Sequence, residues 1–193
     1  MRRRDILMTV LGAACVLSTG AYTFAAKAAP LGIDPTATHG LAIKLARALR
    51  VVGSDICDTA ALRLEASLEN EGNIRLHLRR AALDEAGARI IAHALRSLTP
   101  QEAASLGSFS LSYNHALGDA GVAAIAQSLP RTLREVGLVG CGAGDQGGEA
   151  LYRWASEAAG LQVLCIEENH FSLDLKRRFI ALSRGTRNLL VIV

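Results

Sequence analysis

The segment from Phe109 to Leu129 changes its hydrophobic period once, which predicts a strand followed by a helix. Its first half carries apolar residues two positions apart, Phe109 and Leu111, which is the period of a strand. Asn114 and Gly118 then supply turn chemistry. The second half has apolar residues at helical spacing, namely Val122, Ile125, Ala126 and Leu129.

The same strand–turn–helix pattern returns several times along the chain. The strands are predicted to start at Leu76, Phe109, Val136, Leu164 and Leu190. The steps between these starts are 33, 27, 28 and 26 residues, so one supersecondary unit repeats with a nearly constant period. The longest step predicts an insertion between Thr99 and Leu106, where Pro100 is expected to end the preceding helix.

Polar residues recur at two fixed points of the pattern. Asp119 is expected to be a helix N-cap, because its carboxylate can accept the first free amides of the helix. Five residues after the start of a strand stands an Asn or a Cys, at Asn114, Cys141 and Asn169, whereas the first copy has Ala81 there. An Asn side chain at this point is expected to bond backbone groups that the turn leaves free.

The combined pattern L-x-L-x-x-N/C-x-L, followed by G-D-x-G and a full helix, resembles the ribonuclease-inhibitor class of leucine-rich repeats. The resemblance covers about residues 74–193. It implies an α/β fold, a leucine-rich repeat solenoid shaped as a short horseshoe, with a parallel sheet on the concave side and helices on the convex side. About four copies and a terminal strand are expected.

Residues 30–73 are expected to form an N-terminal cap on this stack. Helical spacing across His39 to Val52 predicts a helix. The turn residues from Glu69 to Asn73 predict a β-hairpin, with residues 60–68 antiparallel to 74–79. The alternative is that residues 55–68 are a degenerate repeat.

The last strand leaves an apolar sheet edge at Leu189 to Val193. Leu190 and Ile192 are expected to face the core, and Val191 and Val193 to face outward. An unpaired apolar edge promotes association. It would be covered by a partner, pair with a second copy to give a homo-oligomer, or mark a truncated solenoid.

Residues 1–29 have the composition of a secretory signal peptide. Arg2 to Arg4 form a basic start, Ile6 to Ala26 is uncharged, and Ala26 to Ala28 gives a small-x-small cleavage pattern. The protein is therefore expected to be exported, periplasmic or secreted. The alternative is a membrane anchor over residues 6–26, because the uncharged run is long enough to span a bilayer.

Charge and cysteine content narrow the function classes. The leader holds four of the chain's 21 basic residues and one of its 18 acidic residues, so the rest is formally neutral and offers no electrostatic reason to bind nucleic acid. Beyond the leader stand Cys57, Cys141 and Cys165, an odd number without metal-ligand spacing. No cofactor, metal or disulfide framework is expected.

The expected function is non-catalytic binding of a protein partner through the outward side chains of the sheet. The predicted contact residues are Arg75, His77, Arg79, Tyr113, Glu135 and Glu167. Cys141 is expected to be buried and Cys165 to face outward. A thiol enzyme using Cys165 and His77 is the less favoured alternative, because these residues lie on the fourth and first strands, about three strand spacings of 4.8 Å apart.

Overall fold

The structure is a computed structural model that describes residues 35–66, 73–186 and 188–193. The chain divides into two units, Met1–Leu31 and Gly32–Val193, and only the second contains described residues. The signal peptide or anchor predicted for residues 1–29 lies outside the described residues. Within the described ranges, no helix has the length and apolar character needed to cross a membrane.

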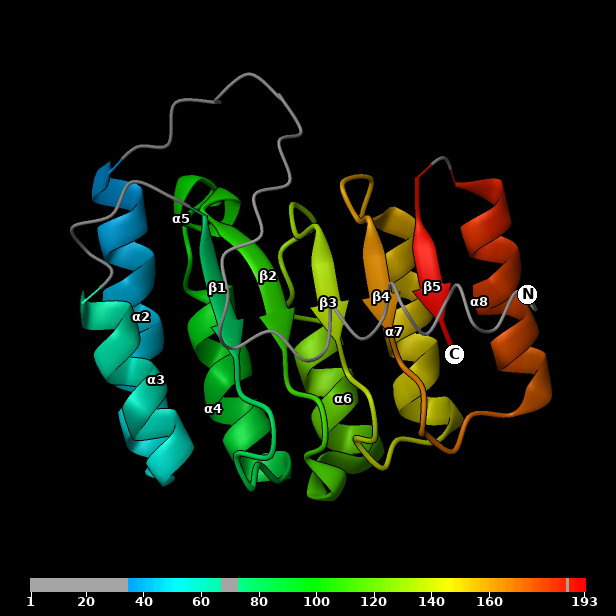
Figure 1. The fold of residues 1–193 in the computed structure, drawn as a ribbon, viewed down its shortest axis with the longest axis horizontal. Helices are drawn as coiled ribbons and strands as arrows, with labels where there is room; N and C mark the ends of the chain where they lie inside the picture. The colour runs from blue at the N-terminus through cyan, green and yellow to red at the C-terminus, as the bar shows by residue number, and fades with distance from the viewer. Residues whose placement is uncertain (1–34, 67–72, 187) are drawn as a thin grey trace, which may run out of the picture. The chain divides into compact units, whose positions relative to one another are not determined.

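Five short strands form one parallel sheet whose order follows the chain (Figure 1). They are β1 (Ile74–His77), β2 (Leu106–Ser110), β3 (Glu135–Gly137), β4 (Val163–Cys165) and β5 (Leu190–Ile192). The register aligns one apolar residue from each strand in a single row, namely Leu76, Phe109, Val136, Leu164 and Val191. The predicted parallel sheet of an α/β fold is confirmed.

A helix follows each of the first four strands and packs on the same face of the sheet (Figure 1). The α-helices are α2 (Pro35–Val52), α3 (Asp55–Ala66), α4 (Glu85–Arg96), α5 (Pro100–Ala104), α6 (Gly118–Ala126), α7 (Asp145–Glu157) and α8 (Leu173–Gly185), and His115–Leu117 forms a 3₁₀ turn, η2. Along the row, α4 contacts α6, α6 contacts α7, and α7 contacts α8. We call the face of the sheet opposite these helices the outward face.

The core lies between the sheet and the helices. Phe109 and Leu164 of the sheet and Ile91, Ile125 and Phe179 of the helices are completely buried. Burying a side chain of this size contributes about 1.5–3 kcal/mol. The core is therefore continuous from one unit to the next, as the repeated period predicts.

Asparagine side chains join neighbouring units, which confirms their predicted role. The amide of Asn114 donates to the carbonyls of Leu78 at 2.8 Å and Leu111 at 2.6 Å, and its oxygen accepts the Leu83 amide at 3.1 Å. Two of these three partners belong to the preceding unit. Asn169 bonds the third unit in the same way, through the Leu138 carbonyl and the Cys141 amide.

Asp119 does not cap its own helix, so that prediction was wrong. It lies within the first turn of α6, where Leu117 is the N-cap. Its carboxylate instead accepts the amide of Gly147 in α7 at 2.6 Å. The 3₁₀ turn η2 runs directly into α6, so Asp119 is already the second residue of the helix. In the first unit, which has no such turn, Asp84 caps α4 by accepting the Gly87 amide at 2.9 Å.

The predicted helix of the cap is confirmed as α2, but the predicted hairpin strand is wrong. Residues 55–66 form the helix α3, with Cys57, Ala61 and Leu64 buried on one face. The spacing of these three residues is helical, and Ser54 accepts the Cys57 amide at the start of the helix. Residues 67–72 lie outside the described ranges. The alternative of a degenerate repeat is not supported either, because residues 55–66 contain no strand.

The insertion before β2 is the short helix α5. The prediction that Pro100 ends the preceding helix was wrong. The helix α4 already ends at Arg96, and Pro100 is the first residue of α5. Thr99 and Glu102 form a reciprocal capping box at its start. Glu102 also accepts from the Lys44 ammonium at 2.6 Å, which ties α5 to the cap helix α2.

The faces of β5 are the reverse of those predicted. Val191 pairs with the core residue Leu164 and packs against the core, while Leu190 lies outward and is 38 % exposed. A start at Val191 restores a step of 27 residues from Leu164, close to the other steps. The alternation itself is uninformative here, because every residue from Leu189 to Val193 is apolar.

Candidate functional site

The outward face carries two ordered rows of side chains across the five strands. The first row is Arg75, Ser108, Glu135, Val163 and Leu190. The second row is His77, Ser110, Gly137, Cys165 and Ile192. Both rows begin with a basic residue type at β1 and a serine at β2, continue with Glu135 or Gly137 at β3, and become apolar at β4 and β5. The face therefore offers a cationic side and an apolar side to anything that lies across it.

The β1 side is accessible. Arg75 and His77 are exposed, and the His77 Nε2 lies 2.8 Å from the Ser108 hydroxyl. Partial removal from solvent lowers the pKa of His77, and Arg75 lowers it further against the opposing effect of Glu135. The imidazole is therefore neutral near pH 7, and the positive charge of this side comes from arginine.

A cluster at the carboxyl ends of the strands centres on Tyr113. The Arg79 guanidinium lies over its ring at 4.0 Å from the centroid, and that of Arg80 at 5.4 Å. The ring of His115 meets it edge-on at 6.4 Å. The Tyr113 hydroxyl donates to the Glu168 carboxylate at 3.4 Å. The ring thus joins two cations that follow β1 to an anion that follows β4, and cation–π contacts hold it in place.

Gly140 makes room for this bridge. It lies between Tyr113 and Glu168 in the strand order, and a Cβ there would lie 3.4 Å from both Tyr113 and His115 and 3.7 Å from the Glu168 carboxylate. Its φ of 59° is also disfavoured for other residues. A glycine beneath the ring therefore lets Tyr113 reach across β3 to Glu168.

The same left-handed backbone occurs at this point in every unit. Arg80, Tyr113, Gly140 and Glu168 each stand four residues after the core residue of their strand, with φ of 54°, 64°, 59° and 59°. Their amides continue the ladder, for example from Arg80 to the Ser112 carbonyl. Positive φ is uncommon outside glycine and often marks a functional constraint. The turn directs these side chains along one rim.

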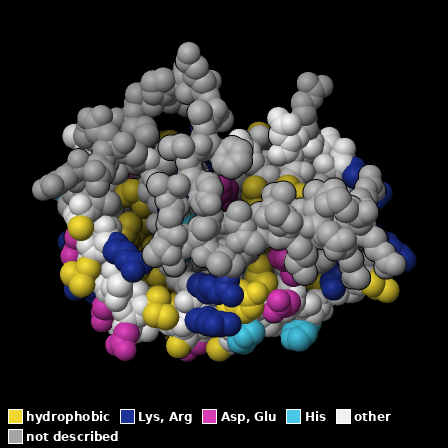
Figure 2. Space-filling view, viewed as in Figure 1, with side chains coloured by type: hydrophobic (Ala, Val, Ile, Leu, Met, Phe, Trp, Pro, Cys, Tyr) yellow, Lys and Arg dark blue, Asp and Glu magenta, His cyan; other side chains and the backbone are white. Residues whose placement is uncertain are grey.

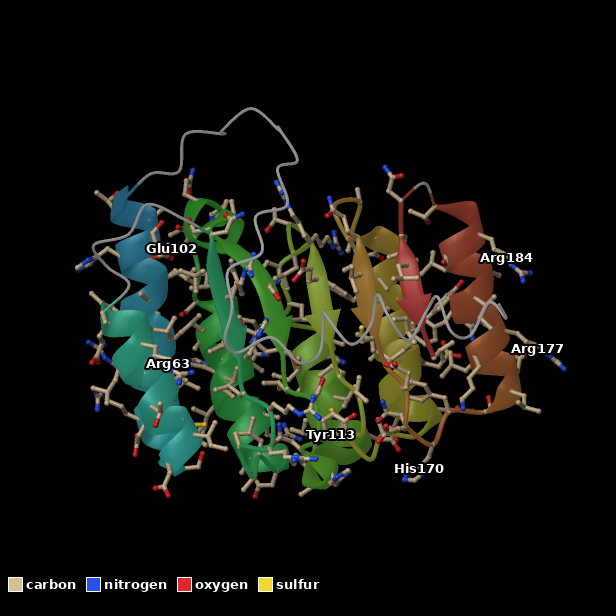
Figure 3. The ribbon with its side chains drawn as sticks, viewed as in Figure 1. Arg63, Glu102, Tyr113, His170, Arg177 and Arg184 are labelled. Atoms are coloured by element: carbon tan, nitrogen blue, oxygen red, sulfur yellow. The ribbon has the colours of Figure 1, made fainter. Side chains whose placement is uncertain are left out.

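The figures locate this rim at one end of the sheet. Figure 3 shows Tyr113 and His170 near the end where the strand arrows finish, and Arg177 and Arg184 on the distant helix α8. Figure 2 shows basic, histidine and acidic side chains gathered along the same lower edge. The structure thus assembles Arg79, Arg80, Tyr113, His115 and Glu168 there.

Five of the six predicted contact residues fall into two groups. Arg79 and Tyr113 belong to the rim cluster, and Arg75, His77 and Glu135 lie in the outward rows beside it. Glu167 is half-buried, and desolvation raises its pKa. Arg80, Gly140 and Glu168 were not among the predicted contact residues. Their position in the repeat could have indicated Arg80 and Gly140, because each stands four residues after the core residue of its strand.

The thiols are shielded. Cys165 lies in an outward row, as predicted, and it is only 5 % exposed. Cys141 is fully buried, as predicted, and burial raises its pKa to about 12. His77 and Cys165 stand in one row with β2 and β3 between them, so they lie three strands apart, as predicted, and do not form a direct thiol–imidazole pair.

The described residues contain no group of three or more His, Cys, Asp or Glu arranged to hold a metal ion. The rim and the outward rows present cations, an aromatic ring and a carboxylate in fixed order. Such an arrangement suits the binding of another molecule by charge and ring contacts. No protein-family model and no curated protein sequence matches the chain.

Proposed function

We propose that the chain is a non-catalytic leucine-rich repeat module of an exported protein, which binds a protein partner through the concave, outward face of its sheet. The recurring strand–turn–helix units and the asparagine links between them support the repeat assignment. Residues 1–29 carry the export signal in this proposal.

One observation carries the binding proposal, namely the alignment of Arg79, Tyr113 and Glu168. These side chains are held across three strand spacings by a cation–π contact and a hydrogen bond. A fixed tyrosine flanked by arginines loses little entropy on binding, and Tyr and Arg dominate the binding energy of protein interfaces. We therefore place the centre of the contact at Tyr113, with Arg75 and Glu135 toward its edge.

Capture from extracts of the native host tests this proposal. The bait is the chain from residue 30 onward, compared with the variant Arg75→Glu/Arg79→Glu/Tyr113→Ala and with the control Arg177→Glu/Arg184→Glu. The control also alters two exposed arginines, but on α8 (Figure 3). A protein retained by the wild type and the control, and lost with the triple variant, supports the proposal. Equal retention by all three baits rejects it.

Self-association through β5 is a second candidate. Among the described strands, β5 pairs only with β4, and its outward residues Leu190 and Ile192 lie beside Val163 and Cys165, respectively. An apolar strand edge favours pairing with a second strand. Light scattering on the purified chain separates the two candidates. A dimer that dissociates on Val191→Pro would support this one, and a monomer at high concentration would reject it.

A further inference from the structure

A shallow groove lies on the helical side of the molecule, away from the outward face, between α2 and α4. Its volume is about 560 Å³. Four apolar residues form its floor, namely Ala48, Val51, Ile90 and Ala94. Basic residues line its sides, namely Lys44, Arg47, Arg89 and His93. No acidic residue lines it within the described part of the chain.

The two helices run antiparallel along this groove. Val52 near the end of α2 approaches Gly87 near the start of α4, while Lys44 reaches the Ser97 carbonyl beyond the end of α4. The groove therefore extends along α2 from Lys44 to Val51, about 10 Å at 1.5 Å per residue. This length corresponds to two turns of a third helix.

The apolar floor is partly open to solvent, at Val51 and Ile90, whereas Ala48 and Ala94 are buried. Val51 is 65 % exposed, although it is large and apolar, and Ile90 is partly buried against the core. Ala48 and Ala94 are small, so the surface between the two helices is hollowed rather than filled. An amphipathic helix could place its apolar side chains there, the recognition mode of helix-in-groove complexes.

The basic side chains that line the groove favour a negatively charged ligand. Lys44 already pairs with Glu102, and Arg89 pairs with Glu85 in an exposed ion pair that is weak enough to exchange. The side chains of Arg47 and His93 have no hydrogen-bond or ion-pair partner among the described residues. Arg47 of α2 thus supplies unpaired positive charge and Arg89 of α4 a cation whose ion pair can exchange, and carboxylates on an incoming helix would complement both.

We infer that this groove binds an acidic amphipathic helix of a protein partner, at a site separate from the outward face. A nucleic acid is disfavoured, because the floor is apolar and the body of the chain is formally neutral. The inference does not depend on the proposed function, because the two surfaces lie on opposite sides of the sheet.

A designed peptide tests the inference. The probe is a fluorescent helix of about 16 residues, since shorter peptides are marginal helices in water. It carries Leu at positions i, i+4 and i+7, with Glu on both sides of this stripe. Two further peptides replace each Glu with Gln or with Lys. Fluorescence anisotropy at low salt is expected to show saturable binding of the Glu peptide, with the Gln and Lys peptides weaker in that order.

Charge reversal in the protein gives the matched comparison. Arg47→Glu/Arg89→Glu is expected to weaken the Glu peptide about tenfold, from two lost attractions at an exposed site, and to strengthen the Lys peptide. The control Arg63→Glu changes an exposed arginine of α3 (Figure 3) and is expected to leave both affinities unchanged. The gain for the Lys peptide shows that the variant is folded and that its groove is intact.

Three results would overturn the inference. The first is no saturable binding of the Glu peptide below about 1 mM. The second is equal binding of the Glu and Gln peptides, which would leave no role for charge. The third is an effect of Arg63→Glu as large as that of Arg47→Glu/Arg89→Glu, which would indicate attraction to the whole surface rather than to the groove.

Discussion

The carboxylate of Asp119 accepts the backbone amide of Gly147 at 2.6 Å, although 28 residues separate them. Gly147 is the third residue of α7, and the N-cap of that helix is Gly144, which has no side chain to accept the amide. The preceding unit therefore supplies the missing cap. One unit further on, Asp145 accepts the amide of Ser172 at 2.7 Å, and Ser172 is the N-cap of α8.

Loss of this shared cap is expected to destabilise the fold. Asp119→Ala should lower the free energy of unfolding by about 1 kcal/mol, the usual effect of removing a capping side chain. Urea denaturation measures it. The control is Asp174→Ala, since Asp174 also lies in a first helical turn but makes no side-chain hydrogen bond within the described residues. Equal losses for the two variants would show that only the helix dipole matters.

Gly148 marks a close approach between α7 and the fourth unit. A Cβ there would lie 2.5 Å from Leu175 and 2.8 Å from Phe171, so Gly148→Ala is expected to cost about 1–3 kcal/mol through overpacking. Gly185→Ala in α8 is the control, because a Cβ at that position meets no atom within 4 Å. Thermal unfolding should show a clear decrease for the first variant only. An unchanged midpoint for Gly148→Ala would contradict the packing described here.

Glu102 is expected to account for part of the loss of folding stability at acidic pH. Burial opposes its ionisation most strongly, but bonds from Lys44 and from the Thr99 amide together outweigh burial, so its pKa lies below the ordinary 4.5. A depressed pKa gives stability that is present above 4.5 and is lost as the pH falls through the folded value. Glu102→Gln should remove this part of the pH dependence in urea titrations.

His77 contributes in the same direction but at higher pH. Its lowered pKa means that stability falls as the pH drops below 6.5. Because both proteins contain His77, the difference between the wild type and Glu102→Gln isolates the carboxylate. Parallel stability curves between pH 5 and pH 3 would contradict the role assigned to Glu102.

The buried thiols should resist alkylation in the folded protein. Cys57, Cys141 and Cys165 are all buried, and the pKa of Cys141 is raised to about 12, so little thiolate forms at neutral pH. Mass spectrometry after brief iodoacetamide treatment is expected to show labelling only when denaturant is added. Rapid labelling of native Cys165 would revive the thiol-based alternative.

Periodicity was sufficient to predict the middle of the fold and insufficient at its two ends. Phe109 lies between Ser108 and Ser110, and Val136 lies between Glu135 and Gly137, so this alternation identifies the core face. From Leu189 to Val193 every residue is apolar, and only the 27-residue step from Leu164 selects Val191. In residues 55–66 the buried Cys57, Ala61 and Leu64 have helical spacing, but nearby turn residues favoured a hairpin.

The rim cluster was only partly predictable. Tyr113 was predicted as a contact residue because it follows directly after a strand. Its bond to Glu168 spans 55 residues and depends on the positive φ at both positions and on the space above Gly140. No local sequence pattern encodes such a pairing, because it arises only when the units stack in register.

Site-specific photo-cross-linking in the native host tests the binding proposal most directly. A photoreactive residue replaces Glu135, which lies beside the rim and outside the alignment of Arg79, Tyr113 and Glu168, or, as the control, Arg177 on α8. Both positions are exposed. The proposal predicts that one protein is trapped covalently at position 135 and not at position 177. No adduct at position 135, or the same adducts at both positions, would contradict it.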